Sequence, residues 1–227
     1  MLPDAFVCWR WRQPGYRHAF PVAAVNVLFR AIRRHYPHPF RAVVLTDDPA
    51  GLDPGIDAVA LPTCFADMPS PHGRHAPACY RRLWAFSRAA VALGRRIVSL
   101  DLDVVVCGPL EPMLERAEPF VGWQDPVYPA QMNGSAWMLT TGAHPEVFDR
   151  FSSAGIAAAR AAGYRGSDQA WLSYCLPNAP RWTRSDGIYS VRGIGDRPPD
   201  DARLVVMHGA VKPWDPAAPP WVREHYS

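Results

Sequence analysis

Two aspartates, Asp101 and Asp103, stand in the otherwise apolar stretch IVSLDLDVVV (residues 97–106). A buried, ionised carboxylate needs a partner, and two neighbouring carboxylates repel each other. In extended chain, residues i and i+2 point to the same side, so both aspartates can converge on one cation. Mg²⁺ and Mn²⁺ prefer oxygen ligands and bridge carboxylates to substrate phosphates. The pair therefore predicts a metal site. The alternative is a plain turn that follows the strand.

An Asp-x-Asp metal site serves two kinds of reaction. One is sugar transfer from a nucleotide diphosphate, in which the metal holds the leaving group. The other is phosphoryl transfer, as in haloacid-dehalogenase-like phosphatases, whose first motif matches residues 101–105 and whose late acidic motif matches Asp196 and Asp200. Against the phosphatase, about half of the chain precedes Asp101. In addition, Lys212, the chain's only lysine, follows the acidic match instead of preceding it.

Strand and helix patterns alternate along the chain. Apolar runs predict strands at residues 5–11, 41–46, 57–61, 97–106, 119–123, 134–140 and 203–207. Helical periodicity predicts helices at residues 20–35, 78–93, 145–152 and 167–176, with a short helix from Pro109. Such alternation with short connections indicates one α/β domain over residues 1–227, an α/β/α sandwich around a central, mostly parallel mixed sheet.

Several polar side chains fall at the ends of predicted strands. In open α/β sheets, ligands bind beyond the carboxyl ends of the strands. Asp47, Asp48, Asp101, Asp103 and His208 all occupy such positions. The sequence therefore predicts a site at this edge of the sheet.

Composition excludes some classes of protein. A net charge of +3 is too small for a strongly basic nucleic-acid binder. The five cysteines are odd in number and have no Cys-x-x-Cys spacing, which argues against a disulfide scaffold or structural zinc and favours reduced thiols in the cytoplasm. No apolar run approaches the roughly 20 residues that span a bilayer, and no signal peptide is evident. The Ala, Arg and Pro bias suggests a bacterial protein.

Five segments within residues 5–214 resemble one family. They are ACYRRLWAF, SLDLDVVVCGPLEPML, MNGSAWMLTTG, GSDQAWLSYC and VVMHGAVKPWD. Together they are similar to the retaining glycosyltransferases of the glycogenin-like group (family 8), which have the Rossmann-like GT-A fold. The resemblance implies transfer of a hexose from a nucleotide-diphospho-sugar, with a UDP-sugar as the expected donor. It does not identify the acceptor, which could be a glycan, a lipid-linked sugar, a protein or a small molecule.

The resemblance implies how the diphosphate is held. Asp103 and His208 would bind the metal, and Asp101 would share it or hold the ribose. The imidazole favours Mn²⁺ over Mg²⁺. Arg82 and Lys212 would offset the charge that develops on the diphosphate leaving group.

The resemblance also implies how the donor sugar is held. Asn133, beside Gly134, and Asp168 would hydrogen-bond to sugar hydroxyls, and Gln169 would lie near the anomeric carbon. The implied route is a front-face displacement that retains the configuration. A double displacement would instead need Asp168 as a nucleophile.

The expected nucleotide contacts come mainly from the first two strands. Trp9, Arg10 and Tyr16 would frame the base, and Cys8 beside them would also contact the nucleotide. The family's inner glycine either corresponds to Gly209 or is absent. Asp47, with Asp48, either reaches the nucleotide or forms a turn. The loop over residues 62–77, with His72 and His75, is either an acceptor lid or an ordinary loop.

Two departures from the family pattern matter. Three residues separate His208 from Lys212 where the family has five, and CWRWRQPGY lacks the family's nucleotide-holding Asn and acidic positions. The identity of the nucleotide base is therefore not predicted by this segment. A protein that binds nucleotide or glycan without turnover is a third interpretation.

Overall fold

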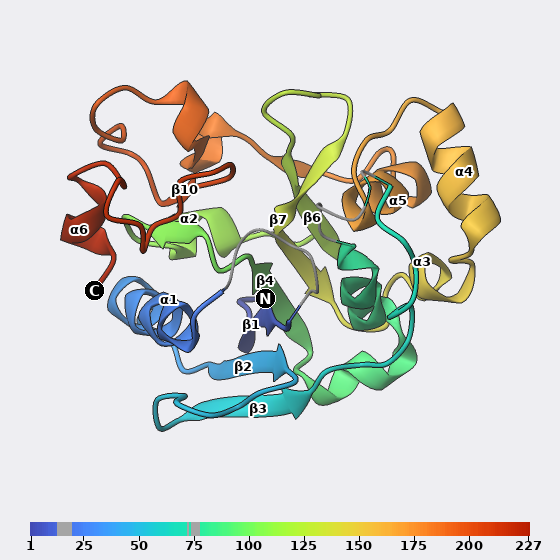
Figure 1. Ribbon diagram of the computed structural model, residues 1–227, viewed down its shortest axis with the longest axis horizontal. Coiled ribbons are helices and arrows are strands. Elements are labelled where there is room, and N and C mark those ends of the chain that lie inside the picture. Colours follow the sequence, from blue (N-terminus) through green and yellow to red (C-terminus); the bar gives the residue numbers. More distant parts are fainter. Residues whose placement is uncertain (13–19, 72, 74–77) are drawn as a thin grey trace.

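A computed structural model describes residues 1–12, 20–71, 73 and 78–227. Its centre is a seven-stranded sheet of mixed direction (Figure 1). In sheet order the strands are β3 (Ile56–Ala60), β2 (Arg41–Thr46), β1 (Ala5–Arg10), β4 (Arg96–Leu100), β7 (Met132–Thr140), β6 (Phe120–Gln124) and β8 (Arg181–Trp182). Strands β3, β2, β1 and β4 run parallel, β7 is antiparallel to β4 and β6, and β8 runs parallel to β6.

Strand β1 shows why the central strands are apolar throughout. Phe6 and Cys8 lie in the core on one face of the sheet, and Val7 and Trp9 lie in the core on the other. Successive strand residues point to opposite faces, so a strand covered on both sides needs apolar residues at every position. The uninterrupted run AFVCW meets this requirement.

Helices cover both faces of the sheet (Figure 1). Residues of α1 (Val22–His35) and α2 (Glu111–Leu114) pack in one core cluster. Residues of the 3₁₀ helix η1 (Cys79–Phe86) and of α3 (Glu146–Asp149), α4 (Ser153–Ala161) and α5 (Asp168–Cys175) pack in the other. The remaining short helices are η2 (Arg88–Ala92), η3 (Arg184–Asp186), η4 (Val191–Gly193) and α6 (Val222–His225). The predicted α/β/α sandwich with a mostly parallel mixed sheet is confirmed.

A second, three-stranded sheet lies beside the first. Its order is β5 (Val104–Val106), β10 (Leu204–Val206) and β9 (Ile188–Ser190), with β10 antiparallel to β5 and parallel to β9. Val104 and Val206 pack in the same core cluster as Leu28 of α1 and Val98 of β4. The two sheets therefore share one hydrophobic core.

The prediction of one strand over residues 97–106 is wrong. Strand β4 ends at Leu100, the amide of Val104 donates to the Asp101 carbonyl at 3.2 Å, and β5 continues in the other sheet. Leu102 is buried at the centre of this turn. Because the chain turns between them, Asp101 and Asp103 do not stand in extended chain.

Two helix predictions need correction, and one helix was missed. Residues 78–93 form η1 and η2 instead of one helix, because Ser87 between them is extended, with φ −71° and ψ 158°. The helix predicted at 145–152 is only α3. Helix α4 was not predicted, although Ser152 caps it by accepting the amide of Gly155 at 3.1 Å and its alanines favour a helix.

All five cysteines lie in the described part of the chain, and none of them forms a disulfide. None of the helices among the described residues has the length and apolar character needed to cross a membrane.

Candidate active site

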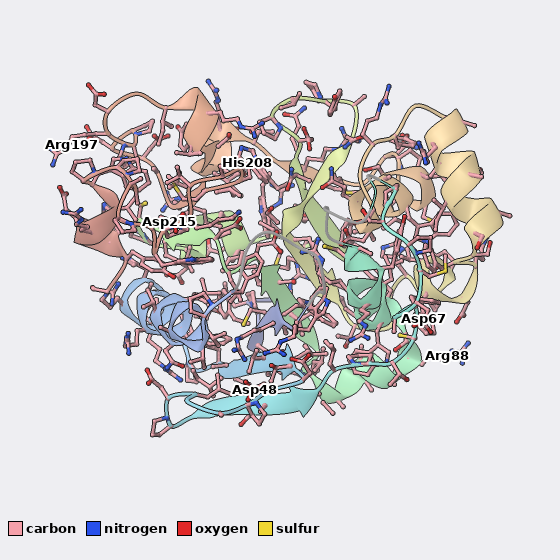
Figure 2. All side chains as sticks on the ribbon, viewed as in Figure 1. Asp48, Asp67, Arg88, Arg197, His208 and Asp215 are labelled. Carbon is pink, nitrogen blue, oxygen red and sulfur yellow. The ribbon has the colours of Figure 1, made fainter. Side chains whose placement is uncertain are left out.

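Arg82 contacts two aspartates of the candidate site that come from different elements. It lies on η1, is 6% exposed, and its guanidinium donates to Asp101 and to Asp168, with Nε and Oδ2 of Asp168 2.8 Å apart. Asp101 follows β4, and Asp168 is the first residue of α5. Arg88, in η2, instead projects outward at the edge of the molecule (Figure 2). Arg82 thus faces the strand ends, whereas Arg88 does not.

Burial and ion pairing act in opposite directions on the pKa values of Asp168 and Arg82. Asp168 is 2% exposed, and burial raises the pKa of its carboxyl while Arg82 opposes the rise. Burial alone would lower the pKa of Arg82, but Asp101 and Asp168 together raise it above its usual range. Arg82 therefore stays charged between its two acidic partners.

Asp103 has a different cation. Its Oδ2 lies 2.5 Å from Nζ of Lys212, and the two residues are 7% and 3% exposed. Burial raises the pKa of Asp103, and Lys212 opposes this shift. Lys212, predicted to face the diphosphate, is instead paired with Asp103.

His208 follows β10 and lies beside Arg192. Its Nε2 is 2.5 Å from Oγ of Ser190 in a hydrogen bond. Burial, and after it the Arg192 charge, lowers the pKa of His208, which favours the neutral imidazole. Gly209 has φ +116°, and a Cβ added there would lie 3.5 Å from Nη2 of Arg192.

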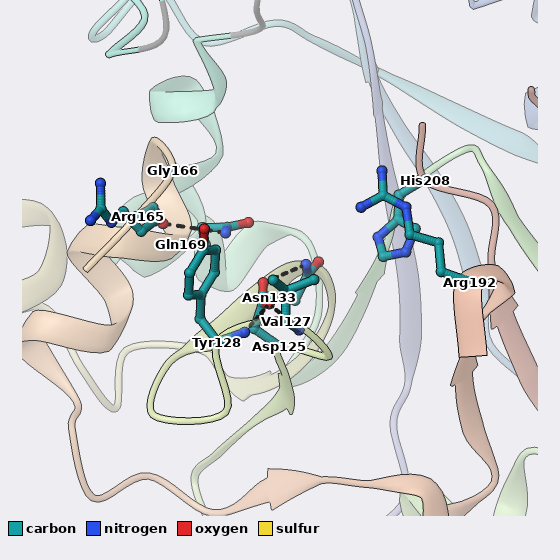
Figure 3. A pocket seen from close by; sticks show the side chains of 9 residues that line it. All are labelled: Asp125, Val127, Tyr128, Asn133, Arg165, Gly166, Gln169, Arg192 and His208. Carbon is teal, nitrogen blue, oxygen red and sulfur yellow. Dashed lines mark hydrogen bonds between the residues drawn. The ribbon is translucent and has the colours of Figure 1, made fainter. Parts of the chain in front are cut away.

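Two of the three side chains predicted to bind the donor sugar meet in a pocket of about 330 Å³ (Figure 3), and the third, Asp168, is not among its lining residues. Asn133 and Gln169 line it, and the amide of Gly134 donates to Oε1 of Gln169 at 3.3 Å. Nε2 of Gln169 donates to the Arg165 carbonyl at 3.3 Å, so both ends of the amide are fixed. His208 lies on the same pocket wall as Arg192.

Four pocket residues with polar side chains were missed by the sequence analysis. They are Asp125, Tyr128, Arg165 and Arg192. Asp125 is 5% exposed, accepts Nδ2 of Asn133 at 2.9 Å, and also accepts the amides of the loop that follows it. The Asp-Pro pair after β6 was the available signal, because aspartate before proline starts turns. The two arginines carry no sequence pattern that marks them.

The predicted nucleotide contacts divide into buried and exposed groups. Cys8 is fully buried in the core, and burial raises the pKa of its thiol. Trp9 is also buried. Arg10 donates to the carbonyl of Asp48 at 2.7 Å, and Asp47 accepts the amide of Arg12 at 3.2 Å, so these polar groups meet beyond β1 and β2.

Three residues named in the sequence analysis, Tyr16, His72 and His75, lie outside the described residues. Asp196, part of the phosphatase-like match, lines a hollow with Trp221 and Glu224 that shares no residue with the pocket of His208. The late acidic match is therefore not part of the pocket that Asn133 and Gln169 line.

Two carboxylates and an imidazole are suitable donors for Mn²⁺ or Mg²⁺. Among the described residues, however, no group of three or more His, Cys, Asp or Glu side chains is placed to hold a metal ion. Asp101 faces Arg82, Asp103 faces Lys212, and His208 bonds to Ser190. In this arrangement the predicted ligands do not fit a divalent ion, and the metal stays a prediction.

Solved structures resemble the whole chain. No family model and no curated protein matches it in sequence. The galactosyltransferase LgtC, in complex with donor and acceptor sugar analogs, matches with a TM-score of 0.70 and 15% identity over 97% of this chain and 93% of that chain. The chain has the GT-A fold of this glycosyltransferase.

Two further structures agree with this assignment. An active-site mutant of LgtC matches with a TM-score of 0.65 and 14% identity over the same shares. The glycosyltransferase GlyE of Streptococcus pneumoniae TIGR4 matches with a TM-score of 0.63 and 12% identity over 97% of this chain and 60% of that chain. The predicted resemblance to glycogenin-like glycosyltransferases is confirmed for the fold. At these identities the likeness establishes the fold and not the reaction.

Proposed function

We propose that this GT-A protein is a glycosyltransferase that moves a hexose from a nucleotide-diphospho-sugar, with UDP as the nucleotide, to an acceptor hydroxyl. The observation that carries the proposal is the pocket in which Asn133 and Gln169 meet, with the Arg82–Asp168 pair directly behind Gly134. Amide side chains suit sugar hydroxyls because each amide both donates and accepts hydrogen bonds. LgtC, whose fold the chain shares, was solved with donor and acceptor sugar analogs.

Retention of the anomeric configuration is part of the proposal. Asp168 would be the nucleophile of a double displacement, but it is 2% exposed and paired with Arg82. A front-face displacement fits better. The bond between the anomeric carbon and the diphosphate oxygen breaks, the acceptor oxygen bonds to that carbon from the same face, and its proton passes to the departing diphosphate. Gln169, fixed at both ends of its amide, would line this face.

The nucleotide would lie beyond β1 and β2. Arg10, Asp47 and Asp48 form a polar group there, and Trp9 precedes Arg10 on β1. This group supports a nucleotide site without selecting a base. The acceptor carries a hydroxyl group, and these contacts do not select its chemical class.

The experiment is a turnover assay. Purified protein is incubated with UDP-hexoses, and UDP release is measured without and with candidate sugar acceptors. We expect release from at least one UDP-hexose, reduced about 10- to 100-fold by Gln169→Ala, because a misplaced reactant loses rate on this scale. Gln124→Ala, at a glutamine outside the pocket lining, is the matched control.

Two other results would change the proposal. UDP binding without release from any donor would favour a nucleotide-binding protein without turnover. Hydrolysis of an aryl phosphate, together with failure to bind UDP, would favour the phosphatase chemistry suggested by the Asp-x-Asp motif.

A further inference from the structure

The chain's single lysine is buried against Asp103. Nζ of Lys212 lies 2.5 Å from Oδ2 of Asp103, and Lys212 is 3% exposed. Lysine is almost never fully buried unless it is paired. Asp103 in turn has the position in the Asp-x-Asp motif at which the sequence predicts a metal ligand. An ammonium group therefore stands where a cation was expected.

Both partners are held by their backbones. The carbonyl of Asp103 accepts the amide of Met207 at 2.8 Å, at the end of the β5–β10 pairing. The amide of Lys212 donates to Oδ2 of Asp215 at 2.6 Å, and the amide of Asp215 donates to the Lys212 carbonyl at 3.0 Å. This turn starts at Lys212, four residues after His208. The short loop between His208 and Lys212 keeps the lysine close to Asp103 at the start of β5.

The other predicted ligands also have partners within the protein. Asp101 is paired with Arg82, and Nε2 of His208 is 2.5 Å from Oγ of Ser190. The repulsion expected between the two motif aspartates is thus relieved by Arg82 on one of them and Lys212 on the other. A metal ion at Asp103 would have to displace a buried ammonium group, which would then lack its partner.

Arg192 supplies a further positive charge on the same wall. It is exposed, lines the pocket beside His208, and forms no ion pair with any of the described residues. An unpaired guanidinium is suited to a diphosphate because it donates two hydrogen bonds in a fixed geometry. The guanidinium of Arg192 could therefore bind an anion at this pocket wall without a metal ion.

We propose that Lys212 takes the place of the divalent cation at Asp103 and that the protein binds its nucleotide-diphosphate donor without a metal ion, with Arg192 facing the diphosphate. This inference rests on the proposed function. It reassigns Lys212 from the diphosphate to the motif aspartate.

The test is calorimetric titration of the wild-type protein with UDP, once in EDTA and once in Mn²⁺. We expect UDP to bind in EDTA with an affinity that Mn²⁺ leaves unchanged. A metal that bridges protein and diphosphate would instead tighten UDP binding by about 5- to 150-fold, the usual range of coupling between two ligands. Binding that requires Mn²⁺ would overturn the inference and leave the glycosyltransferase proposal intact. Absence of binding in both conditions would overturn the UDP donor itself.

Two variants separate the roles of the cations. Arg192→Ala should weaken UDP binding in EDTA about tenfold, the size expected from one lost charge-assisted contact. Arg223→Ala, at an exposed arginine of α6 outside the pocket lining, is the matched control and should bind as the wild type does. Unchanged binding by Arg192→Ala would contradict its assignment to the diphosphate.

Lys212→Met leaves Asp103 without its cation. If the ammonium group replaces a metal, Mn²⁺ alone should raise the melting temperature of this variant and leave that of the wild type unchanged. A rise for the wild-type protein would overturn the inference. Should Lys212→Met fail to fold, the double variant Asp103→Asn/Lys212→Met, which removes both charges, should fold and show no response to Mn²⁺. A Mn²⁺ response in that double variant would place the ion elsewhere and contradict the assignment.

Discussion

Arg82 is the side chain on which two carboxylates depend. It is 6% exposed and pairs with Asp101 and Asp168, and Asp168 is itself 2% exposed. Removing one partner of a buried ion pair costs about 3–5 kcal/mol, because the other charge stays buried. We therefore expect Arg82→Ala to lower the free energy of unfolding by about this amount in urea denaturation. Arg88→Ala, at an exposed arginine nearby, should change it by no more than about 0.5 kcal/mol. Equal effects of the two variants would contradict the burial argument.

Gly134 is a second position at which a single atom matters. A Cβ added there would lie 2.5 Å from Nη2 of Arg82 and 3.4 Å from Oδ2 of Asp168. Because Arg82 is held by both carboxylates, it cannot move away freely. We expect Gly134→Ala to lower the free energy of unfolding by about 1–3 kcal/mol, as overpacking does, and to reduce UDP release in the turnover assay. Gly195→Ala, where an added Cβ meets no atom within 4 Å, should leave both unchanged.

At the residue scale, the sequence predicted the members of the site better than their partners. Two of the residues named from type and order, Asn133 and Gln169, line one pocket, and the amide of Gly134 donates to Gln169. The partner of Lys212 could not be predicted from the sequence. The loop between His208 and Lys212 is two residues shorter than the family pattern, and loop length affects where a side chain lies without changing the motif residues. Arg192 was missed for a similar reason, since an arginine in a loop is usually a solvated surface residue.

At the scale of elements, the turn between β4 and β5 decides where the motif aspartates point. Leu102, at the centre of the turn, is 2% exposed and packs in the core cluster with α1. Leu102→Ala should therefore lower the free energy of unfolding by about 2–5 kcal/mol, the usual range for a buried leucine. Leu102→Met, which nearly conserves volume, should lose less than about 1.5 kcal/mol. Urea denaturation measures both, and a small loss for the alanine variant would show that the turn is not anchored by this side chain.

An ion pair between α2 and β6 gives a pH dependence with a definite sign. Nη2 of Arg116 lies 2.7 Å from Oε1 of Glu118, and this hydrogen bond lowers the pKa of Glu118 to about 2. Since the folded-state pKa is below that of an unfolded glutamate, the pair stabilises the protein above about pH 4.5, and this contribution is lost as the pH falls towards 2.

Glu118→Gln tests this contribution. The variant should be less stable than the wild type at pH 7, by no more than about 1 kcal/mol because the pair is partly exposed. The difference should shrink between pH 4.5 and pH 2. Glu115→Gln, at an exposed glutamate of the same segment, is the control, and a difference that grows in acid would contradict the sign.

The elements themselves were predictable where periodicity was strong. Helix α1 and strands β1 and β2 lie within two residues of their predicted bounds, because long apolar patterns and Pro37 define them. The β4–β5 break was not predictable, since IVSL and VVV are equally apolar and only the placement of β5 beside β10 separates them. The split at Ser87 likewise depends on packing and not on the helical period of residues 78–93.

For the whole molecule, the shared core predicts how the protein unfolds. Val104 and Val206 of the small sheet pack in the same cluster as Val98 of β4 and Trp182 of β8. Neither sheet can expose its side of this cluster without exposing the other, so one cooperative transition should link them. A single domain over residues 1–227, as predicted, should unfold in this cooperative way, and it stays a prediction until unfolding is measured.

Urea unfolding followed by far-UV circular dichroism and by tryptophan fluorescence measures this cooperativity. The two signals should give one coincident transition, because the nine tryptophans include Trp123 and Trp182 of the shared core and circular dichroism reports on both sheets. Saturating UDP, at about 100 times its dissociation constant, should shift the whole transition by about 2.7 kcal/mol without splitting it. Transitions that did not coincide would show that the β5–β10–β9 sheet unfolds separately from the seven-stranded sheet. The motif aspartate at the start of that sheet would then be held less firmly than the pairing of Asp103 with Lys212 implies.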